Sequence, residues 1–153
     1  MLLDDITAAS RAKRVLVDPF SYVIDFNTLA ASAVNQPGQF AVNADSDFVL
    51  RYSMIVSMSA VGVEITRPDY LFTMNDTGSG RSLENTGDHV LNGFGTAQWP
   101  YVWSEPKLFT ASSTLTVQLT NLTAVAARVV LTFGGFKVFY MRGYNRDNAF
   151  FLS

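Results

Sequence analysis

The sequence predicts an all-β protein, an antiparallel β-sandwich of about eight strands, and three observations support this. Apolar and polar residues alternate with a period of two along most of the chain, which places them on opposite faces of a strand. Clusters of Gly, Pro, Asn and Asp separate these runs, as expected for turns. Helical periodicity is scarce. The 153 residues, 48% of them hydrophobic, contain no linker or internal repeat and are expected to form a single domain, 1–153.

The clearest alternation runs from Asp47 to Ala60 and predicts one long strand. One parity is mostly apolar and comprises Phe48, Leu50, Tyr52, Met54, Val56 and Met58. The other is mostly polar and comprises Arg51, Ser53, Ser57 and Ser59, interrupted by Val49 and Ile55. The two sets are expected on opposite faces of this strand.

The remaining strands are predicted from the same alternation. In chain order they span residues 22–29, 39–43, 70–74, 89–92, 101–103, 114–121, 127–133 and 136–141. Gly134-Gly135 is interpreted as the break between the last two strands. Two short helices are expected outside the pattern, at 4–14 and 28–34, the first with Asp4 or Thr7 as N-cap.

Composition and charge exclude several classes of function. The chain has no cysteine, which excludes disulfides and cysteine-ligated metals. Its formal net charge of −2 gives no reason to expect specific nucleic-acid or membrane binding. The N-terminus carries acids where a signal peptide would carry bases, and no apolar run approaches the ~18 residues of a membrane span.

No enzymatic site, metal or cofactor is predicted. The one histidine, His89, follows Asp88, but neighbouring strand residues point to opposite faces and no nucleophile motif accompanies them. Asp45-Ser46-Asp47 is interpreted as a strand-initiating turn, because a calcium loop needs more oxygen ligands. Gly78-Ser79-Gly80-Arg81 is interpreted as a hairpin loop, because no helix follows it to bind a phosphate. An enzyme whose catalytic carboxylates are brought together only by the fold remains an alternative.

Three rings of one parity, Trp99, Tyr101 and Trp103, form the most site-like feature of the sequence. Exposed aromatic rings bind sugars, so a glycan-binding β-sandwich is one interpretation. Packing in the core or between subunits is the other, because aromatic side chains bury large areas.

Two further features suggest contacts with other subunits. Between Ser82 and Ala127 the only charged residues are Glu84, Asp88, Glu105 and Lys107, and such a weakly charged, Thr-rich exterior suits packing against neighbours. The C-terminal tail, 142–153, loses the alternation yet ends in Phe-Phe-Leu, and it is expected to dock on its own domain or on a neighbouring chain.

Residues 20–140 also resemble a known family in the order of their motifs. These motifs are Asp45-Ser46-Asp47-Phe48-Val49-Leu50-Arg51-Tyr52, Asn75-Asp76-Thr77-Gly78-Ser79-Gly80-Arg81-Ser82-Leu83, Gly93-Phe94-Gly95-Thr96-Ala97-Gln98-Trp99-Pro100-Tyr101, Pro106-Lys107-Leu108-Phe109 and Leu115-Thr116-Val117-Gln118-Leu119-Thr120-Asn121-Leu122-Thr123. In this order they resemble small structural proteins from the head-gene region of tailed bacteriophages. Several of those look like jelly-roll capsid decoration or cement proteins.

The resemblance implies a jelly-roll-like fold and a virion structural role at the capsid surface, after assembly in the host cytoplasm. Its implied partners are the major capsid protein and further copies of the chain, as a homo-oligomer (dimer or trimer). A glycan-binding component of a fibre, tail or host-attachment structure is the alternative. Both termini lie outside the matched region and are expected as flexible arms, 1–19 and 142–153. The contact residues predicted on these arms are Leu2, Leu3, Ile6, Tyr144, Phe150, Phe151 and Leu152.

Overall fold

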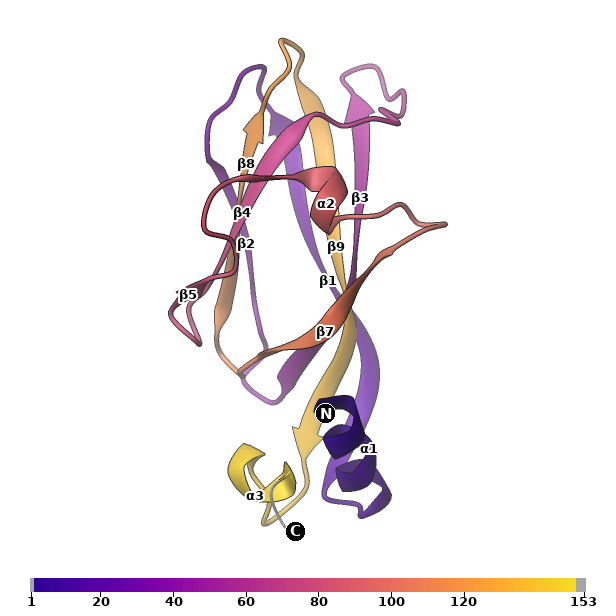
Figure 1. The fold of residues 1–153 in the computed structure, drawn as a ribbon, viewed down its shortest axis with the longest axis vertical. Coiled ribbons are helices and arrows are strands. Elements are labelled where there is room, and N and C mark those ends of the chain that lie inside the picture. Colours follow the sequence, from indigo (N-terminus) through magenta and orange to yellow (C-terminus); the bar gives the residue numbers. More distant parts are fainter. Residues whose placement is uncertain (1, 151–153) are drawn as a thin grey trace.

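The computed structural model describes residues 2–150 and consists of two packed antiparallel sheets (Figure 1). In the four-stranded sheet the order is β1 (Val15–Leu29), β9 (Ala127–Tyr140), β3 (Asp47–Ser59) and β7 (Tyr101–Phe109). In the second sheet the order is β2 (Gln36–Ala41), β8 (Thr114–Asn121), β4 (Tyr70–Asp76) and β5 (Arg81–Ser82), with β6 (Asp88–His89) also paired to β4. The helices are α1 (Leu2–Arg11), α2 (Val90–Gly93) and α3 (Arg146–Phe150).

The strand order is that of a jelly roll. The short strands β5 and β6 pair with different parts of β4 and share one edge position, so each sheet has four strand positions. Along the chain, β1 to β4 and then β7 to β9 alternate between the two sheets. Eight positions in two sheets with this connectivity match the jelly-roll architecture. The predicted fold class is confirmed.

Most predicted strands are present, but three local predictions are wrong. Residues 89–92 are not a strand, because α2 begins at Val90. Residues 28–34 are not a helix, because β1 continues to Leu29, which pairs with Ala127. Gly134-Gly135 does not break the last strand, since β9 runs unbroken through it and pairs with β1 and β3 on its two sides. The helix expected near the N-terminus is found as α1.

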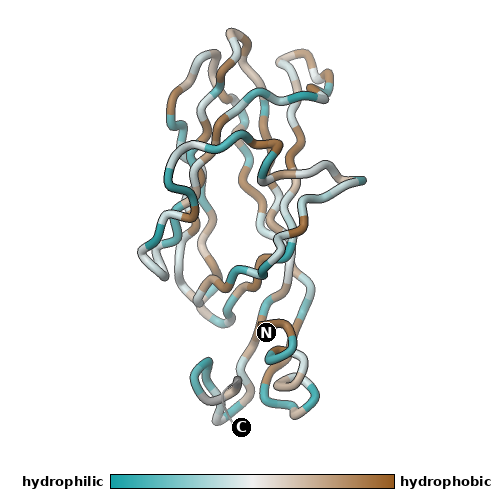
Figure 2. Tube along the Cα trace, in the orientation of Figure 1, coloured by the Kyte–Doolittle hydropathy of each residue, from teal (hydrophilic) through white to brown (hydrophobic). Residues whose placement is uncertain are grey.

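The main core lies between the sheets and is rich in aromatic rings. Tyr22 stacks on Phe40 with centroids 4.4 Å apart, and Phe94 meets Phe133 edge to face at 5.6 Å. The apolar parity of β8 is fully buried and comprises Leu115, Val117 and Leu119. Figure 2 shows the alternation of hydropathy along these strands. Because this core fixes which side chains of each strand point inward, it also fixes which ones form the outer faces.

The buried parity of β3 switches at a β-bulge. The register with β9 shifts between Leu50 and Tyr52, which leaves Arg51 as the extra residue. Before the bulge Phe48 and Leu50 fill the core, whereas after it the buried residues are Ser53, Ile55 and Ser57. The prediction that one parity keeps a single face along this strand is therefore wrong beyond Leu50, because one extra residue exchanges the two faces.

Within residues 2–150 the terminal segments pack against the protein, whereas the sequence predicts flexible arms at 1–19 and 142–153. The ends of β1 and β9 project beyond the sandwich as a two-stranded ribbon, and α1 and α3 lie beside it (Figure 1). A second apolar cluster joins the helices to this ribbon and consists of Ile6, Ala9, Val15, Val49, Val138 and Ala149. Within residues 2–150 no helix is long and apolar enough to span a membrane.

Candidate interaction surface

The outer face of the four-stranded sheet is apolar although no other element of residues 2–150 packs over its centre. Directly paired residues share a face, so Val23, Thr132 and Met54 lie outside, opposite the core row formed by their neighbours along each strand. We call this surface the open face and define it by Val23, Tyr52, Met54, Val56, Val102, Val130 and Phe136. Val23 is 54% exposed, Val56 39% and Val102 57%.

The outer face of the second sheet has the opposite character. The half-buried positions of β8 there are Thr114, Thr116, Gln118 and Thr120, and β4 adds Thr73 and Asn75. A sheet face that meets water is normally polar in this way. The outer faces of the two sheets therefore differ in polarity, and only that of the four-stranded sheet exposes a row of large apolar side chains.

After the bulge β3 buries two serines, Ser53 and Ser57, and hydrogen bonds compensate for their burial. Ser53 Oγ donates to the Gly93 carbonyl and accepts from Trp103 Nε1 at 3.1 Å. Ser57 Oγ lies 2.7 Å from Tyr70 Oη. Buried hydroxyls with partners cost little, so the bulge can move Tyr52, Met54 and Val56 outward without leaving these serines unsatisfied.

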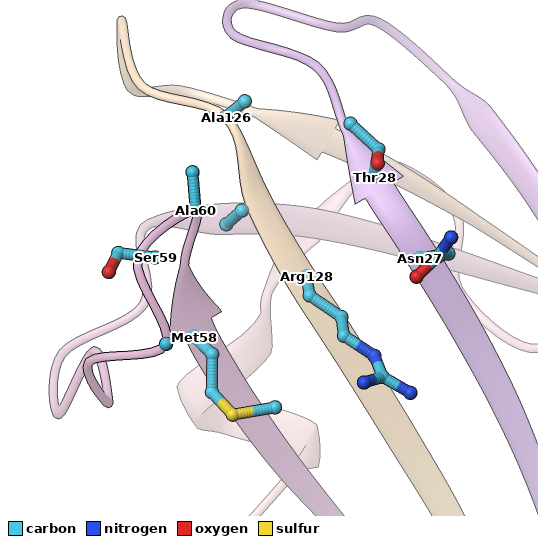
Figure 3. A pocket seen from close by; sticks show the side chains of 9 residues that line it. Asn27, Thr28, Met58, Ser59, Ala60, Ala126 and Arg128 are labelled. Atoms are coloured by element: carbon cyan, nitrogen blue, oxygen red, sulfur yellow. The ribbon is translucent and has the colours of Figure 1, made fainter.

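A charged pair marks one end of the open face. Arg128 Nη2 and Nε donate to the two Asp25 oxygens at 2.6 and 3.2 Å. The hydrogen bonds from this guanidinium hold the pKa of Asp25 below its ordinary value. Arg128 also lines a hollow of about 410 Å³ at the end of β1, β3 and β9, together with Met58 and otherwise small or polar side chains (Figure 3). Both charges are exposed and already paired with each other.

The other end of the open face contains a groove with an unpaired cation. A hollow of about 350 Å³ under α1 and one of about 270 Å³ beside β7 share two lining residues, Arg51 and Phe136. We call the two together the Arg51 groove. Its further lining residues are Leu3, Ile6, Thr7, Ser10, Arg11 and Val17 on the α1 side, and Pro19, Tyr52, Val102 and Gly135 on the other.

The predicted contact residues at the termini differ in how exposed they are. Ile6 is only 5% exposed and packs in the second apolar cluster, where Leu2 is half-buried, while Leu3 lines the Arg51 groove. Tyr144 is 38% exposed. Phe150 ends α3, but its side chain, and all of Phe151 and Leu152, lie outside the described residues. A contact of these residues with another subunit stays a prediction.

The three aromatic rings do not form one exposed row. Trp99 is 80% exposed and Tyr101 37%, but Trp103 packs against the core and donates to Ser53. Tyr101 and Trp103 meet edge to face at 5.4 Å. Trp99 instead borders a groove of about 290 Å³ with Ile55, Leu91 and Phe94 among its walls. A sugar would therefore meet one freely exposed ring.

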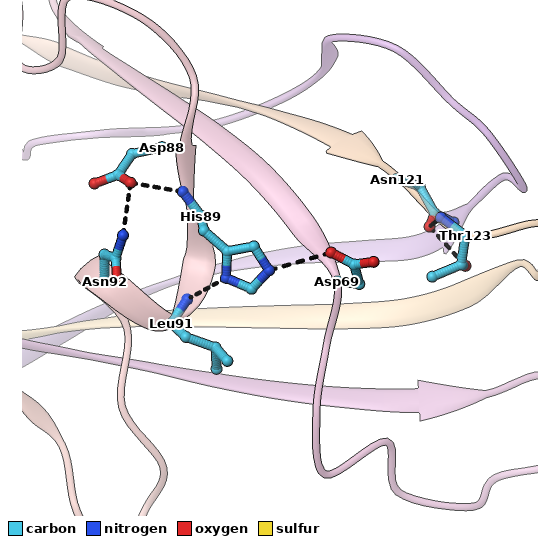
Figure 4. A network of polar contacts seen from close by, with 7 residues as sticks. All are labelled: Asp69, Asp88, His89, Leu91, Asn92, Asn121 and Thr123. Atoms are coloured by element: carbon cyan, nitrogen blue, oxygen red, sulfur yellow. Dashed lines mark hydrogen bonds and ion pairs between the residues drawn. The ribbon is translucent and has the colours of Figure 1, made fainter.

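His89 has a structural role at the start of α2 (Figure 4). Its Nδ1 accepts the backbone N–H of Leu91 at 3.2 Å, and its Nε2 lies 3.2 Å from Asp69 Oδ1. The neighbouring Asp88 accepts from the backbone N–H of His89 and from Asn92, not from the ring. Both ring nitrogens are thus engaged, and among residues 2–150 no serine or other nucleophile is hydrogen-bonded to them.

The two other sequence motifs are turns, as predicted. Asp47 accepts from the backbone N–H of Ala111 at 2.7 Å and from Tyr140 Oη at 2.5 Å, which ties the start of β3 to neighbouring segments. Burial raises the pKa of Tyr140 far above its ordinary value, and the Asp47 hydrogen bond adds to this. In the β4–β5 loop, Asp76 accepts from the N–H groups of Gly78 and Ser79. Within residues 2–150 no group of His, Asp and Glu could hold a metal ion.

Comparison with known proteins adds one distant likeness. No protein-family model matches the chain, and no curated protein matches it. The chain is similar to a solved structure, the cryo-EM structure of the virus-like particle of extra small virus from the giant freshwater prawn Macrobrachium rosenbergii. The TM-score is 0.25 and the identity 13%, over 77% of this chain and 78% of that one. So low a TM-score carries no weight for function, and the fold assignment rests on the strand order described above.

Proposed function

We propose that the chain is a structural protein of a virus particle that binds the capsid shell through its open face. The observation that carries the proposal is the apolar outer face of one sheet beside the polar outer face of the other. Soluble monomers rarely expose contiguous apolar patches of large side chains, and such patches mark sites of protein association. A sandwich with one apolar outer face is suited to a module that is repeated over a shell.

The finer assignment comes from the sequence resemblance, which favours a capsid decoration or cement protein of a tailed bacteriophage. In that role the major capsid protein contacts the open face, and further copies of the chain bind one another as a dimer or trimer. Many copies on one shell bind multivalently, so each single contact need not be strong. The location is then the capsid surface of the virion.

A matched pair of lysine substitutions tests this proposal. Val56→Lys places a charge on the open face, and Thr116→Lys places the same charge on the outer face of the second sheet. Both positions are at least partly exposed, so thermal unfolding should differ little from the natural protein. In sedimentation with shells assembled without the protein, Val56→Lys should lose binding and Thr116→Lys should keep it. Equal binding of the two variants would refute the use of the open face.

Glycan binding is the second candidate, favoured by the 80% exposure of Trp99 beside its groove. An exposed indole face stacks on a sugar ring, and the stacking changes its fluorescence. Titration with oligosaccharides should then change the fluorescence of the natural protein but not of Trp99→Ala. The half-buried Trp103 is the internal control, because it remains in the variant.

A further inference from the structure

We infer that the Arg51 groove binds an acidic segment of a neighbouring polypeptide, with a carboxylate on Arg51 and apolar side chains on both sides of it. The inference rests on the proposed function and names the chemistry of the partner at one end of the open face. It is carried by the charge, the lining and the shape of the groove.

The cation in the groove has no partner of its own. Arg51 Nε is buried and makes no hydrogen bond, and the side chain forms no ion pair among residues 2–150. No carboxylate lines either hollow, whereas a second guanidinium, that of Arg11, lines the one under α1. In a chain of net charge −2, this groove is therefore locally basic.

An arginine in such a place favours a carboxylate ligand. The guanidinium stays protonated, and a partly desolvated charge without a counter-ion is unfavourable. A carboxylate accepts two parallel N–H bonds from it, which restores the lost hydration and fixes the orientation of the ligand. By contrast, Arg128 at the other end of the face is already bound by Asp25 in this manner.

The shape of the groove identifies a peptide as the occupant. Arg51 and Phe136 line both hollows, so the cation has apolar walls in each of them. Leu3, Ile6 and Val17 form one wall, and Pro19, Tyr52 and Val102 form the other. A fatty acid has its carboxylate at one end and would fill only one hollow. A segment with Asp or Glu between apolar residues fills both.

A pair of peptides provides the test on the isolated full-length protein. The probes are acetyl-Leu-Phe-Asp-Phe-Leu-amide and the same peptide with Asn in place of Asp, titrated by heteronuclear NMR. The Asp peptide should bind at least about tenfold more tightly than the Asn peptide and should shift the backbone signals of Arg51 and Phe136. Its affinity should fall as salt is added, because the contact is partly ionic.

Three variants locate the contact. Arg51→Gln should remove the preference for the Asp peptide, while Arg128→Gln, the matched control on the same face, should retain it. Because Arg51 occupies a bulge and its replacement could unfold the protein, Val102→Glu is the second variant. Val102 is 57% exposed, so the new carboxylate can pair with Arg51 from within the groove and should abolish peptide binding in a folded protein.

Two results would overturn the inference. One is equal affinity for the two peptides, or no binding of either at millimolar concentration. The other is decanoate shifting the same signals while the Asp peptide does not, since the occupant would then be an anionic amphiphile. These measurements need no shells, so their failure is distinguishable from a failure of shell binding by the open face.

Discussion

The bulge in β3 depends on a residue without a side chain, and Gly135→Ala tests this dependence. Gly135 pairs with Leu50, immediately before the bulged Arg51. A Cβ atom on Gly135 would overlap the carbonyl group of Val49 and approach the backbone nitrogen of Arg51 to 3.2 Å. Both obstacles are backbone atoms of the paired strand, so no side-chain rotation can remove the overlap.

The expected loss of stability is about 3 kcal/mol. Relief of the overlap requires β3 and β9 to separate locally, at an overpacking cost of about 1–3 kcal/mol. The separation also weakens adjacent ladder hydrogen bonds, each contributing about 1 kcal/mol. For a domain of this size, 1 kcal/mol corresponds to about 2–4 °C in Tm, so the midpoint should fall by about 6–12 °C.

Thermal unfolding followed by circular dichroism measures this effect, with Gly87→Ala as the matched control. A Cβ on Gly87 would meet only Leu71, at the ordinary contact distances of 3.5 and 3.7 Å. The control should therefore unfold within about 2 °C of the natural protein, or slightly above it, since alanine restricts the unfolded chain. Equal midpoints for the two variants would show that the close approach at the bulge does not exist.

Three further substitutions test particular contacts. Burial raises the pKa of Glu84 above 4.5, so its ionisation disfavours the folded state. The free energy of unfolding of Glu84→Gln should therefore rise relative to the natural protein as the pH increases from about 4 to 7 in urea titrations; a constant difference would contradict this. Tyr140→Phe removes the donor to Asp47 and should cost about 2 kcal/mol in the same assay, and no loss would mean that the bond does not form. Ser57→Ala leaves the buried Tyr70 hydroxyl without this partner and should cost about 1–3 kcal/mol, whereas an unchanged midpoint would show that another group replaces the serine.

Regular strands were predictable from the sequence because their neighbours reinforce the local pattern. β8 spans Thr114–Asn121 as predicted, since it pairs along its length with β2 and β4 and has no irregularity in either register. The failures occur where tertiary pairing overrides local chemistry. Gly134-Gly135 has the composition of a turn, yet both glycines lie inside β9, where a Cβ atom on Gly134 would overlap the ring of Tyr52 and one on Gly135 would overlap the backbone of Val49.

The candidate surface was less predictable than the fold. The sequence directed attention to the termini and to the Thr-rich exterior, but the exposed apolar residues Val23, Val56 and Val102 lie together on the outer face of the four-stranded sheet. Neither Arg51 nor Phe136 attracts notice in the sequence, because one is a single charge in a strand and the other belongs to a predicted core pattern. Their proximity depends on the register of β3 against β9 and on the position of α1, which no local pattern encodes.

The bulge connects the fold to the proposed function. Had β3 kept its first register, Tyr52, Met54 and Val56 would have continued the buried row of Phe48 and Leu50, and the serines would have faced solvent. Of the apolar residues that define the open face, the sheet would then keep only Val23, Val102, Val130 and Phe136 outside. One extra residue adds Tyr52, Met54 and Val56 to this face, and the bulged residue is Arg51 itself, so the same irregularity enlarges the apolar surface and places the cation at its end. It follows that a substitution that removes the bulge without unfolding the protein should weaken shell and peptide binding together, because it turns Tyr52, Met54 and Val56 away from the open face.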